Sequence, residues 1–523
     1  MGWGIGRVQL NDDEDDAESN VLSTDENSGG LGGGADHAEE EKQQQGRLWV
    51  IMVPHVVVGE LVKVRIFRNQ RNYSEGDLVE VIEPSPNRVE PRCSLAGLCG
   101  GCQYQHMSIA AQREWKTLHV QEVLLQQGID GYDCVEAISS KLTPTIGTDE
   151  VFGYRSKLTP HYEAPLEIGL DTYRLDAIGF QQSSNRQLVD VPFCPIATPA
   201  INEALKVTRE KLHEQAQMGL LNKKKKKRRR GSRGDKAAGA TLLFRQADDD
   251  ENGQAVVITD HNQYMTTTVK GVQFRYLAGN FFQNNNHVLP LMVDAVLEAA
   301  MAPKTKASTT CIDGDDGDDG DDKSQHHHFL SYLIDCYCGS GLFALSAAKN
   351  FTVCVGIEVN EKAIAEAQNN AKLNDIDNCH FVAASAEAIF TSPPTVPVPA
   401  AITTSVVVAG DESSEEDVSS SSQQRQLLKV SDFPRDDTVV VLDPPRKGCS
   451  TEFLEQLYQY SPQRIVYMSC GPATQARDAK GIVEIGGYDI VSIQPFDLFP
   501  QTKHIECLIV FEKRRRTPAE NDS

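Results

Sequence analysis

The sequence predicts an α/β protein whose carboxyl-terminal part is a doubly wound, Rossmann-like sheet preceded by two further regions that contain strands. From about residue 329 to 513, apolar strand patterns alternate with helical patterns, which is typical of an open sheet with helices on both faces. Upstream, short strands separated by Gly and Pro predict a small barrel, and a cysteine-rich segment opens a mixed α+β region. A chain of 523 residues can bury sizeable cores for two or three such domains.

Changes in composition divide the chain into three expected domains and a tail. Acidic, Gly- and Ser-rich tracts bury too little apolar surface to offset the entropy of ordering, so we expect them to be disordered inserts. The predicted segments are a β-barrel at 1–91 with an acidic insert at 11–45, a central α+β domain at 92–286 with a basic insert at 222–236, an α/β domain at 287–513 with low-complexity inserts at 302–328 and 391–426, and a disordered tail at 514–523.

The formal net charge of −23 says little about the partner, because the inserts dominate it. A basic run at 223–236 carries ten Lys and Arg and one Asp, and without this run and four acidic tracts the net charge is −4. The run is either a solvated loop or a patch for nuclear import or RNA anchoring. The three histidines at 326–328 are either low-complexity sequence or metal ligands. The acidic tracts lie at 12–41, 248–251, 313–322 and 411–417.

The first region is β-rich, with strands predicted at 2–8, 48–53, 60–69 and 77–83. The first strand lies at the very start of the chain, which indicates a chain that begins inside a folded element, so we do not expect Met1 to be the native start. The basic side chains of this region either face solvent at alternate positions of an edge sheet or form a basic surface. They are Lys63, Arg65, Arg68 and Arg71.

The central region opens with a cysteine cluster. Cys93, Cys99 and Cys102 lie within ten residues, and Cys194 in a Pro-Phe-Cys-Pro segment completes four thiols. Four thiolates hold zinc or an iron–sulfur cluster, and the spacing does not separate the two; unligated loop thiols are the alternative. Thirteen cysteines without a secretory apolar segment indicate reduced thiols in a soluble, intracellular protein whose compartment stays open. Mixed strands follow, for example at 178–182.

The α/β region alternates strands and helices, and a helix at 361–374 is typical of its pattern. Cysteines within or beside its strands are expected to be small core residues; they are Cys336, Cys338, Cys354 and Cys507. The strands are predicted at 332–335, 353–358, 380–383, 438–443 and 464–469, with a terminal pair that ends at 507–512.

A glycine turn after the first of these strands predicts a nucleoside site. The segment Asp335-Cys-Tyr-Cys-Gly-Ser-Gly opens a helix, whose N–H groups face a ligand. Glu358 ends the next strand, where a carboxylate can bind both ribose hydroxyls. The full G-x-G-x-x-G pattern is missing, so the turn favours an adenosine without pyrophosphate, as in S-adenosylmethionine. The alternative is a generic turn with a solvent-facing Glu358.

Asp443-Pro-Pro-Arg446 ends the fourth strand at the same sheet edge. Methylases that act on exocyclic amino groups carry an aromatic residue after the paired prolines, so Arg446 indicates another target atom.

A cysteine and a carboxylate flank the last strands. Cys470 follows the fifth strand directly, and Arg477 and Asp478 are expected to begin the next helix, whose positive end can lower a thiol pKa. Glu506 precedes the last strand. A thiolate that adds to carbon 6 of uracil makes carbon 5 nucleophilic, and a base must then remove the carbon-5 proton. Cys470 and Glu506 suit these two steps, and Cys449 is the competing nucleophile.

Five segments in order resemble the RNA uridine-5-methyltransferase family, whose members make 5-methyluridine in tRNA and large-subunit rRNA. The resemblance implies Cys470 as nucleophile and Glu506 as base, with Leu342 replacing the Asn that some members carry and a loose match near Ser385. It also implies cofactor contacts from Gln283, Tyr337, Glu358 and Asp443. The segments are Asn280-Phe-Phe-Gln, Asp335-Cys-Tyr-Cys-Gly-Ser-Gly, Asp443-Pro-Pro-Arg-Lys-Gly, Ser469-Cys-Gly-Pro-Ala-Thr and Phe499-Pro-Gln-Thr-Lys-His-Ile-Glu.

Residues 92–107 resemble the four-iron segment of one branch of this family, which implies a [4Fe-4S] cluster, with zinc as the alternative, on Cys93, Cys99, Cys102 and Cys194. The first region resembles a TRAM domain, a small RNA-binding barrel. The implied function is methylation of a flipped-out uracil in rRNA or tRNA. We expect a monomer without membrane contact, since no apolar run approaches the roughly 18 residues of a membrane span.

Two alternatives stay open. An RNA cytosine-5-methyltransferase normally carries a cysteine in the Asp-Pro-Pro position, and Cys449 sits too late in that loop. A catalytically idle RNA-binding or RNA-folding protein could keep the fold, but here both Cys470 and Glu506 are present.

Overall fold

The structure is a computed structural model. Most of the predicted inserts, the tail, the basic run at 223–236 and the histidines at 326–328 lie outside the residues that it describes. The described residues are 3–9, 22–23, 48–169, 172–222, 239–248, 253–303, 329–399 and 425–514.

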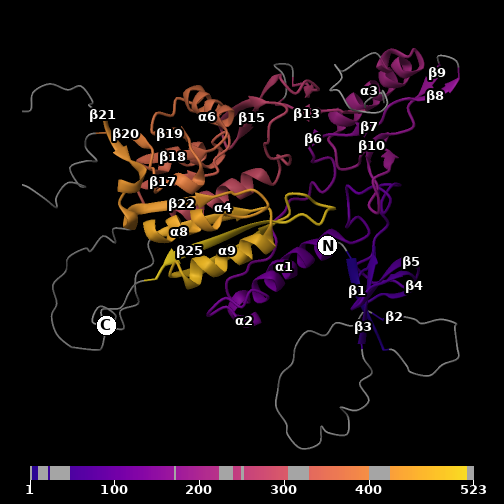
Figure 1. The fold of residues 1–523 in the computed structure, drawn as a ribbon, viewed down its shortest axis with the longest axis horizontal. Coiled ribbons are helices and arrows are strands. Elements are labelled where there is room, and N and C mark those ends of the chain that lie inside the picture. Colours follow the sequence, from indigo (N-terminus) through magenta and orange to yellow (C-terminus); the bar gives the residue numbers. More distant parts are fainter. Residues whose placement is uncertain are drawn as a thin grey trace, which may run out of the picture.

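A seven-stranded sheet forms the carboxyl-terminal domain, in the order β19-β18-β17-β22-β23-β25-β24 (Figure 1). The first five strands in this order are parallel, and β25 runs antiparallel between β23 and β24. The predicted doubly wound α/β sheet is therefore confirmed. Its strands are β17 (Tyr332–Cys336), β18 (Val353–Glu358), β19 (Cys379–Ala383), β22 (Thr438–Leu442), β23 (Arg464–Ser469), β24 (Tyr488–Phe496) and β25 (Glu506–Lys513).

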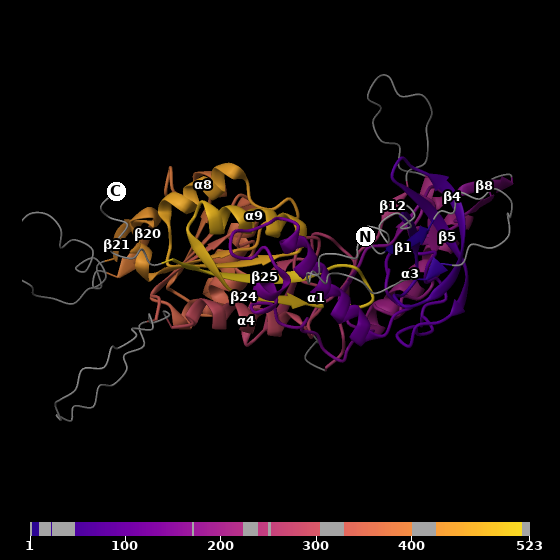
Figure 2. The same ribbon diagram turned by 90° about the horizontal axis from the view of Figure 1, so that it is seen from below.

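Helices cover both faces of this sheet, which is why strands such as β22 are buried along their whole length. Figure 2 shows α8 and α9 on one side of the sheet and α4 on the other. The first side has α8 (Thr451–Tyr460), α9 (Pro472–Glu484), α1 (Ile109–Leu125) and α2 (Val135–Ser139). The second has α4 (Leu289–Met301), α5 (Leu342–Ala347), α6 (Glu361–Leu373) and the hairpin of β15 (Tyr264–Val269) and β16 (Val272–Leu277).

The core of the α/β domain extends beyond the boundary expected at residue 286. Val120 and Leu124 of α1 and Ile138 of α2 pack into the core under α9. Phe274 of β16 packs into the core on the opposite face. Two segments that precede the expected boundary therefore stabilise the sheet, because they cover apolar side chains on its faces that would otherwise be exposed.

The amino-terminal region forms a five-stranded sheet in the order β1-β3-β5-β4-β2. The four predicted strands are present, and β5 begins at Tyr73, four residues earlier than expected. Ion pairs across the β4–β5 hairpin join Arg65 to Asp77 at 2.9 Å and Arg68 to Glu75 at 3.2 Å. The strands are β1 (Trp3–Gln9), β2 (Leu22–Ser23), β3 (Leu48–Pro54), β4 (Leu61–Asn69) and β5 (Tyr73–Glu83).

The central region forms two small antiparallel sheets beside the long helix α3 (Pro199–Gln217), and a hairpin of β8 and β9 lies near them (Figure 1). Leu205 of α3 and Phe244 of β13 belong to its own small core. Its strands are β6 (Lys157–Leu158), β7 (His161–Tyr162), β8 (Leu166–Gly169), β9 (Thr172–Arg174), β10 (Ile178–Gln181), β11 (Leu188–Asp190), β12 (Ala240–Thr241), β13 (Phe244–Gln246) and β14 (Val257–Ile258).

The insert expected at 391–426 has ordered ends. Thr395–Pro399 (β20) pairs antiparallel with Arg425–Lys429 (β21). Val396 and Val398 are buried against the α/β core, so apolar residues at both edges of the insert order its base. Within the described ranges, the helices are too short or too polar to cross a membrane.

Candidate active site

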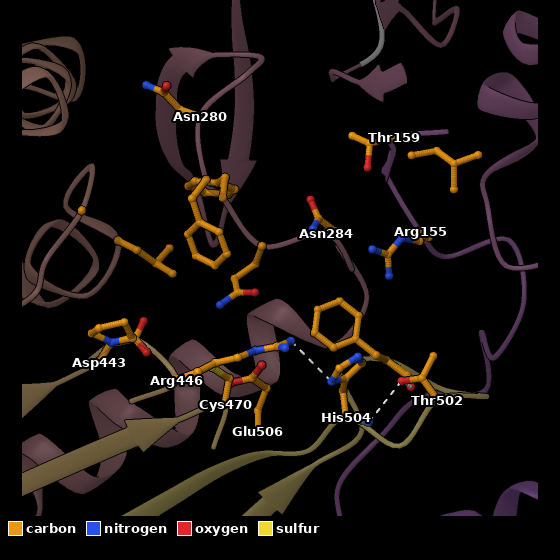
Figure 3. Close-up of a pocket in the computed structure, with 18 of the residues that line it drawn as sticks. Arg155, Thr159, Asn280, Asn284, Asp443, Arg446, Cys470, Thr502, His504 and Glu506 are labelled. Carbon is orange, nitrogen blue, oxygen red and sulfur yellow. Dashed lines mark hydrogen bonds between the residues drawn. The ribbon is translucent and has the colours of Figure 1, made fainter. Parts of the chain in front are cut away.

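A cavity of about 1080 Å³ opens at the carboxyl edge of the parallel strands, where the central region faces the sheet (Figure 3). Such an edge is where open α/β sheets bind ligands. All ten residues that were predicted to act in catalysis, cofactor binding or cluster ligation line this one cavity. They are Cys93, Cys99, Cys102, Cys194, Gln283, Tyr337, Glu358, Asp443, Cys470 and Glu506.

The turn after β17 lines one side of the cavity. Tyr337 and Gly341 have positive φ values of 64° and 92°. A Cβ on Gly341 would stand 3.0 Å from the ring of Phe381, so the positive φ and this tight contact together favour glycine. Asp335 lies beneath and accepts a hydrogen bond of 3.0 Å from the N–H of Ala344, which fixes the start of α5. Burial raises the pKa of Asp335 to about 8.

Two basic residues that sequence reasoning missed hold the Asn280–Gln283 segment. Arg245 is buried, and its guanidinium donates to the carbonyls of Ala278, Asn280 and Phe282 at 3.3, 2.6 and 3.2 Å. Lys157 donates to the carbonyl of Asn280 at 3.2 Å. These contacts fix the backbone that presents Gln283 to the cavity.

Cys470 lies half-buried directly after β23. Burial, Glu506 and Asp443 raise its pKa, whereas Arg446 lowers it. The sequence predicted a thiol acidified by a helix start, but burial and two carboxyl groups raise the pKa of Cys470 instead. The helix α9 also begins at Pro472, earlier than the predicted Arg477.

Cys449, the competing nucleophile, belongs to the apolar core. Its thiol donates to the hydroxyl of Tyr467 at 3.8 Å, and its backbone N–H donates to Asp478 at 2.8 Å. Burial raises the pKa of Cys449 to about 12. A buried thiol that stays protonated is a poor nucleophile, so Cys470 is the better placed of the two. Cys336, Cys338, Cys354 and Cys507 are buried, as predicted.

Glu506 is the first residue of β25, and 4% of its surface is exposed. Burial and the neighbouring Asp443 raise its pKa to about 8, against the opposing effects of Arg446 and Lys116. Burial also raises the pKa of Asp443 to about 7. A carboxylate with a raised pKa is a stronger base, so Glu506 suits proton abstraction near neutral pH.

Arg446 and His504 both line the cavity and point toward each other (Figure 3). The guanidinium of Arg446 donates to Nδ1 of His504 at 3.5 Å. Burial and Arg446 lower the pKa of His504 to about 4, so a neutral imidazole accepts this bond. The bond holds Arg446 beside Cys470. The segment that contains His504 is part of the resemblance seen in the sequence, but no role was predicted for this histidine.

The four predicted cluster cysteines also line this cavity and lie near one another. The pKa of Cys102 is raised to about 12 by burial and by the nearby thiols of Cys194, Cys99 and Cys93. All four thiols are free. In the part of the chain that the structure describes, no three His, Cys, Asp or Glu side chains are grouped as a site for one metal ion.

Known proteins resemble this chain over most of its length. The family model of the tRNA (uracil-5-)-methyltransferases matches residues 325–393 and 407–514. A tRNA (uracil(54)-C(5))-methyltransferase of Schizosaccharomyces pombe is 32% identical over 474 residues, which cover 89% of this chain and 74% of that protein. The Saccharomyces cerevisiae protein of the same name is 27% identical over 504 residues, which cover 89% of this chain and 69% of that protein.

A solved structure shares the fold. Pyrococcus abyssi tRNA (uracil-54, C5)-methyltransferase, in complex with S-adenosyl-L-homocysteine, matches with a TM-score of 0.54 at 19% identity. The match covers 88% of this chain and 95% of that chain.

The doubly wound sheet, with a glycine turn and an acidic residue at its carboxyl edge, is the fold that this solved methyltransferase shares. The chain belongs to the RNA (uracil-5-)-methyltransferase family. It is accordingly an enzyme that transfers a methyl group to carbon 5 of uracil in RNA.

Proposed function

We propose that the protein makes 5-methyluridine in tRNA, with Cys470 as the covalent nucleophile and Glu506 as the base. The observation that carries this proposal is the meeting of both residues in the cavity that also holds the turn after β17. The two fungal relatives are named as tRNA (uracil(54)-C(5))-methyltransferases, which favours tRNA over rRNA.

The reaction needs a thiolate first. The sulfur of Cys470 adds to carbon 6 of the uracil, and the electron pair of the 5,6 double bond becomes an enolate centred on carbon 5. S-adenosylmethionine, when bound, supplies an electrophilic methyl group, and carbon 5 takes it as the bond to the sulfonium sulfur breaks. Arg446 lowers the thiol pKa of Cys470 and so favours the thiolate.

A proton transfer completes the cycle. Glu506 takes the proton from carbon 5, the double bond re-forms, and the electron pair of the carbon–sulfur bond returns to Cys470. Glu506 is buried and Asp443 is partly buried, so the carboxylate of Glu506 has little contact with bulk water. The nucleoside would contact Glu358, Tyr337, Gln283 and Asp443.

RNA would approach between the sheet edge and the central region. Phe281 lines the cavity with 78% of its surface exposed, and an exposed ring can stack on a base turned out of its strand. Phe67 of β4 is 49% exposed beside Arg68, so the amino-terminal sheet offers aromatic and basic side chains together. We assign that sheet, within residues 1–91, to a TRAM-like RNA-binding barrel.

The four converging cysteines would hold a [4Fe-4S] cluster within the central domain, residues 92–286. The thiols of Cys194, Cys99 and Cys93 all raise the pKa of Cys102, which supports a shared site for the four cysteines. The task of the cluster would be structural, since methyl transfer needs no electron. The remaining residues, 287–513, would form the methyltransferase domain.

Covalent trapping tests the chemistry. RNA with 5-fluorouridine at the target has no carbon-5 proton to lose, so the adduct accumulates. We expect a stable adduct with the wild-type protein and S-adenosylmethionine, none with Cys470→Ala, and an undiminished one with the matched control Cys449→Ala. An adduct that survives Cys470→Ala contradicts the mechanism. Mass-spectrometric mapping of 5-methyluridine in cells lacking the gene tests the target, and a loss confined to rRNA contradicts the tRNA assignment.

A further inference from the structure

An ion pair on α9 contacts the loop that carries Arg446. Asp478 is buried, and its Oδ2 accepts hydrogen bonds of 2.8 Å from the backbone N–H of Cys449 and from the hydroxyl of Tyr467. Its Oδ1 accepts bonds of 2.9 and 2.6 Å from Nε and Nη2 of Arg477. The end of the loop between β22 and α8 is therefore fixed to α9 through a buried carboxylate.

Arg477 binds the backbone of the same loop. Its Nη2 lies 3.1 and 3.2 Å from the carbonyl oxygens of Lys447 and Cys449. Gly448 stands between these two residues with a φ of 78°. A Cβ on Gly448 would lie 2.6 Å from Nη2 of Arg477 and 2.7 Å from Oδ2 of Asp478. The loop thus packs directly on the ion pair.

The backbone of Arg446 also touches the segment that follows Cys470. A Cβ on Gly471 would stand 3.1 Å from the carbonyl oxygen of Arg446. The hydroxyl of Thr474, in the first turn of α9, lies 3.0 Å from that oxygen and 2.9 Å from the carbonyl oxygen of Gly471, so it bridges the two segments. From this backbone, the side chain of Arg446 extends past Cys470 to His504 (Figure 3).

We propose that Arg477 is a positioning residue for Arg446: together with Asp478 it fixes the loop after β22, so that the guanidinium of Arg446 lies beside the sulfur of Cys470. The proposal rests on the proposed function, in which Cys470 is the nucleophile. It gives the Arg477–Asp478 pair a part in the chemistry, although neither side chain touches the reacting atoms.

Stability alone is a weaker reason for these contacts. The side chain of Arg477 is 53% exposed, so water can reach its guanidinium, and ion pairs with an exposed partner add little to stability. A cation near a reacting sulfur, in contrast, is effective only in a narrow range of positions. For the same reason, Arg477 can be replaced without leaving a closed cavity in the core.

A double-mutant cycle on the rate of adduct formation with 5-fluorouridine RNA and S-adenosylmethionine tests the proposal. Arg477→Met should slow the reaction about tenfold, because Arg446 loses its fixed place. Arg446→Met should slow it as well. Adding Arg477→Met to Arg446→Met should change the rate by less than about twofold, because two residues that act through one group have effects that do not add. A merely structural role of Arg477 would slow both backgrounds equally.

Two further variants keep the test decisive. Arg477→Lys keeps a charge beside Asp478 but loses the planar fork, and it should give the same pattern if Arg477→Met folds poorly. Arg514→Met is the matched control, because Arg514, directly after β25, is also a half-exposed arginine whose Nε lies 2.7 Å from a carboxylate, that of Asp489. Its rate should stay that of the wild type. Equal slowing in both backgrounds, or a wild-type rate in either single methionine variant of Arg446 and Arg477, overturns the proposal. A wild-type protein that forms no adduct overturns the proposed function beneath it.

Discussion

Gln112 of α1 and Gln501 of the loop before β25 exchange two hydrogen bonds. Nε2 of Gln112 donates to Oε1 of Gln501 at 3.0 Å, and the backbone N–H of Gln501 donates to Oε1 of Gln112 at 2.9 Å. Gln501 has a φ of 70°, a left-handed conformation that the surroundings must stabilise. The carbonyl of Gln501 also accepts from the N–H groups of Gln103 and Tyr104. The loop that leads to Glu506 is therefore held by the cysteine segment and by α1.

Replacing Gln112 by Leu should loosen this loop. The variant removes the partner of the backbone N–H and of Oε1 of Gln501, so we expect a loss of about 2 kcal/mol in the free energy of unfolding. It should also lower kcat, because Glu506 loses its fixed position. Urea denaturation and steady-state methylation measure the two effects. Gln126→Leu is the control, since Gln126 bonds to Glu122 on the surface, and equal losses in both variants would contradict the role of the loop.

Arg245→Met should weaken cofactor binding. The guanidinium of Arg245 donates to the carbonyls before Gln283, and its Cζ lies 4.8 Å from the ring centre of Tyr276. Without it the segment gains freedom that binding must remove, so Kd for S-adenosylhomocysteine should rise about tenfold. Isothermal calorimetry measures this. Arg275→Met, which removes an arginine stacked on Tyr264 in the same hairpin, should leave Kd unchanged.

The sheet and the reacting residues could be predicted because both leave a local pattern. Strands such as β18 and β23 are buried on both faces, so their apolar runs are unbroken and their ends visible. Cys470 and Glu506 adjoin such strand ends. Lys116 and Arg245 leave no such pattern, because a buried cation looks like a surface one until carbonyls or carboxylates distant in the sequence surround it. The acidity of Cys470 was misjudged for the same reason: Asp443 and Glu506 act on it through space.

Iron content tests the cysteine site. Protein purified without oxygen should be brown and carry about four irons per chain, and Cys102→Ser should lose them. Loss should also lower kcat, since Gln103 and Tyr104 beside Cys102 hold the loop of Gln501. Cys134→Ser, at the exposed start of α2, is the control and should keep its iron. Stoichiometric zinc in the wild-type protein would contradict the cluster.

Replacing Glu506 by Gln should stabilise the protein relative to wild type at pH 8 but not at pH 4. A carboxyl group whose pKa is about 8 when folded but near 4 when unfolded is neutral in the native state and ionised in the unfolded state between those values. The unfolded state then binds fewer protons, so this group lowers stability as the pH rises from about 4 to about 8. Glutamine does not titrate and avoids the loss. We expect a difference near zero at pH 4 that grows to about 5 kcal/mol at pH 8, measured by urea denaturation. Glu455→Gln, on the exposed side of α8, should show a difference that does not change with pH. A stability gain of Glu506→Gln that is the same at both pH values would mean that Glu506 is ionised in the resting enzyme, with Lys116 and Arg446 outweighing burial.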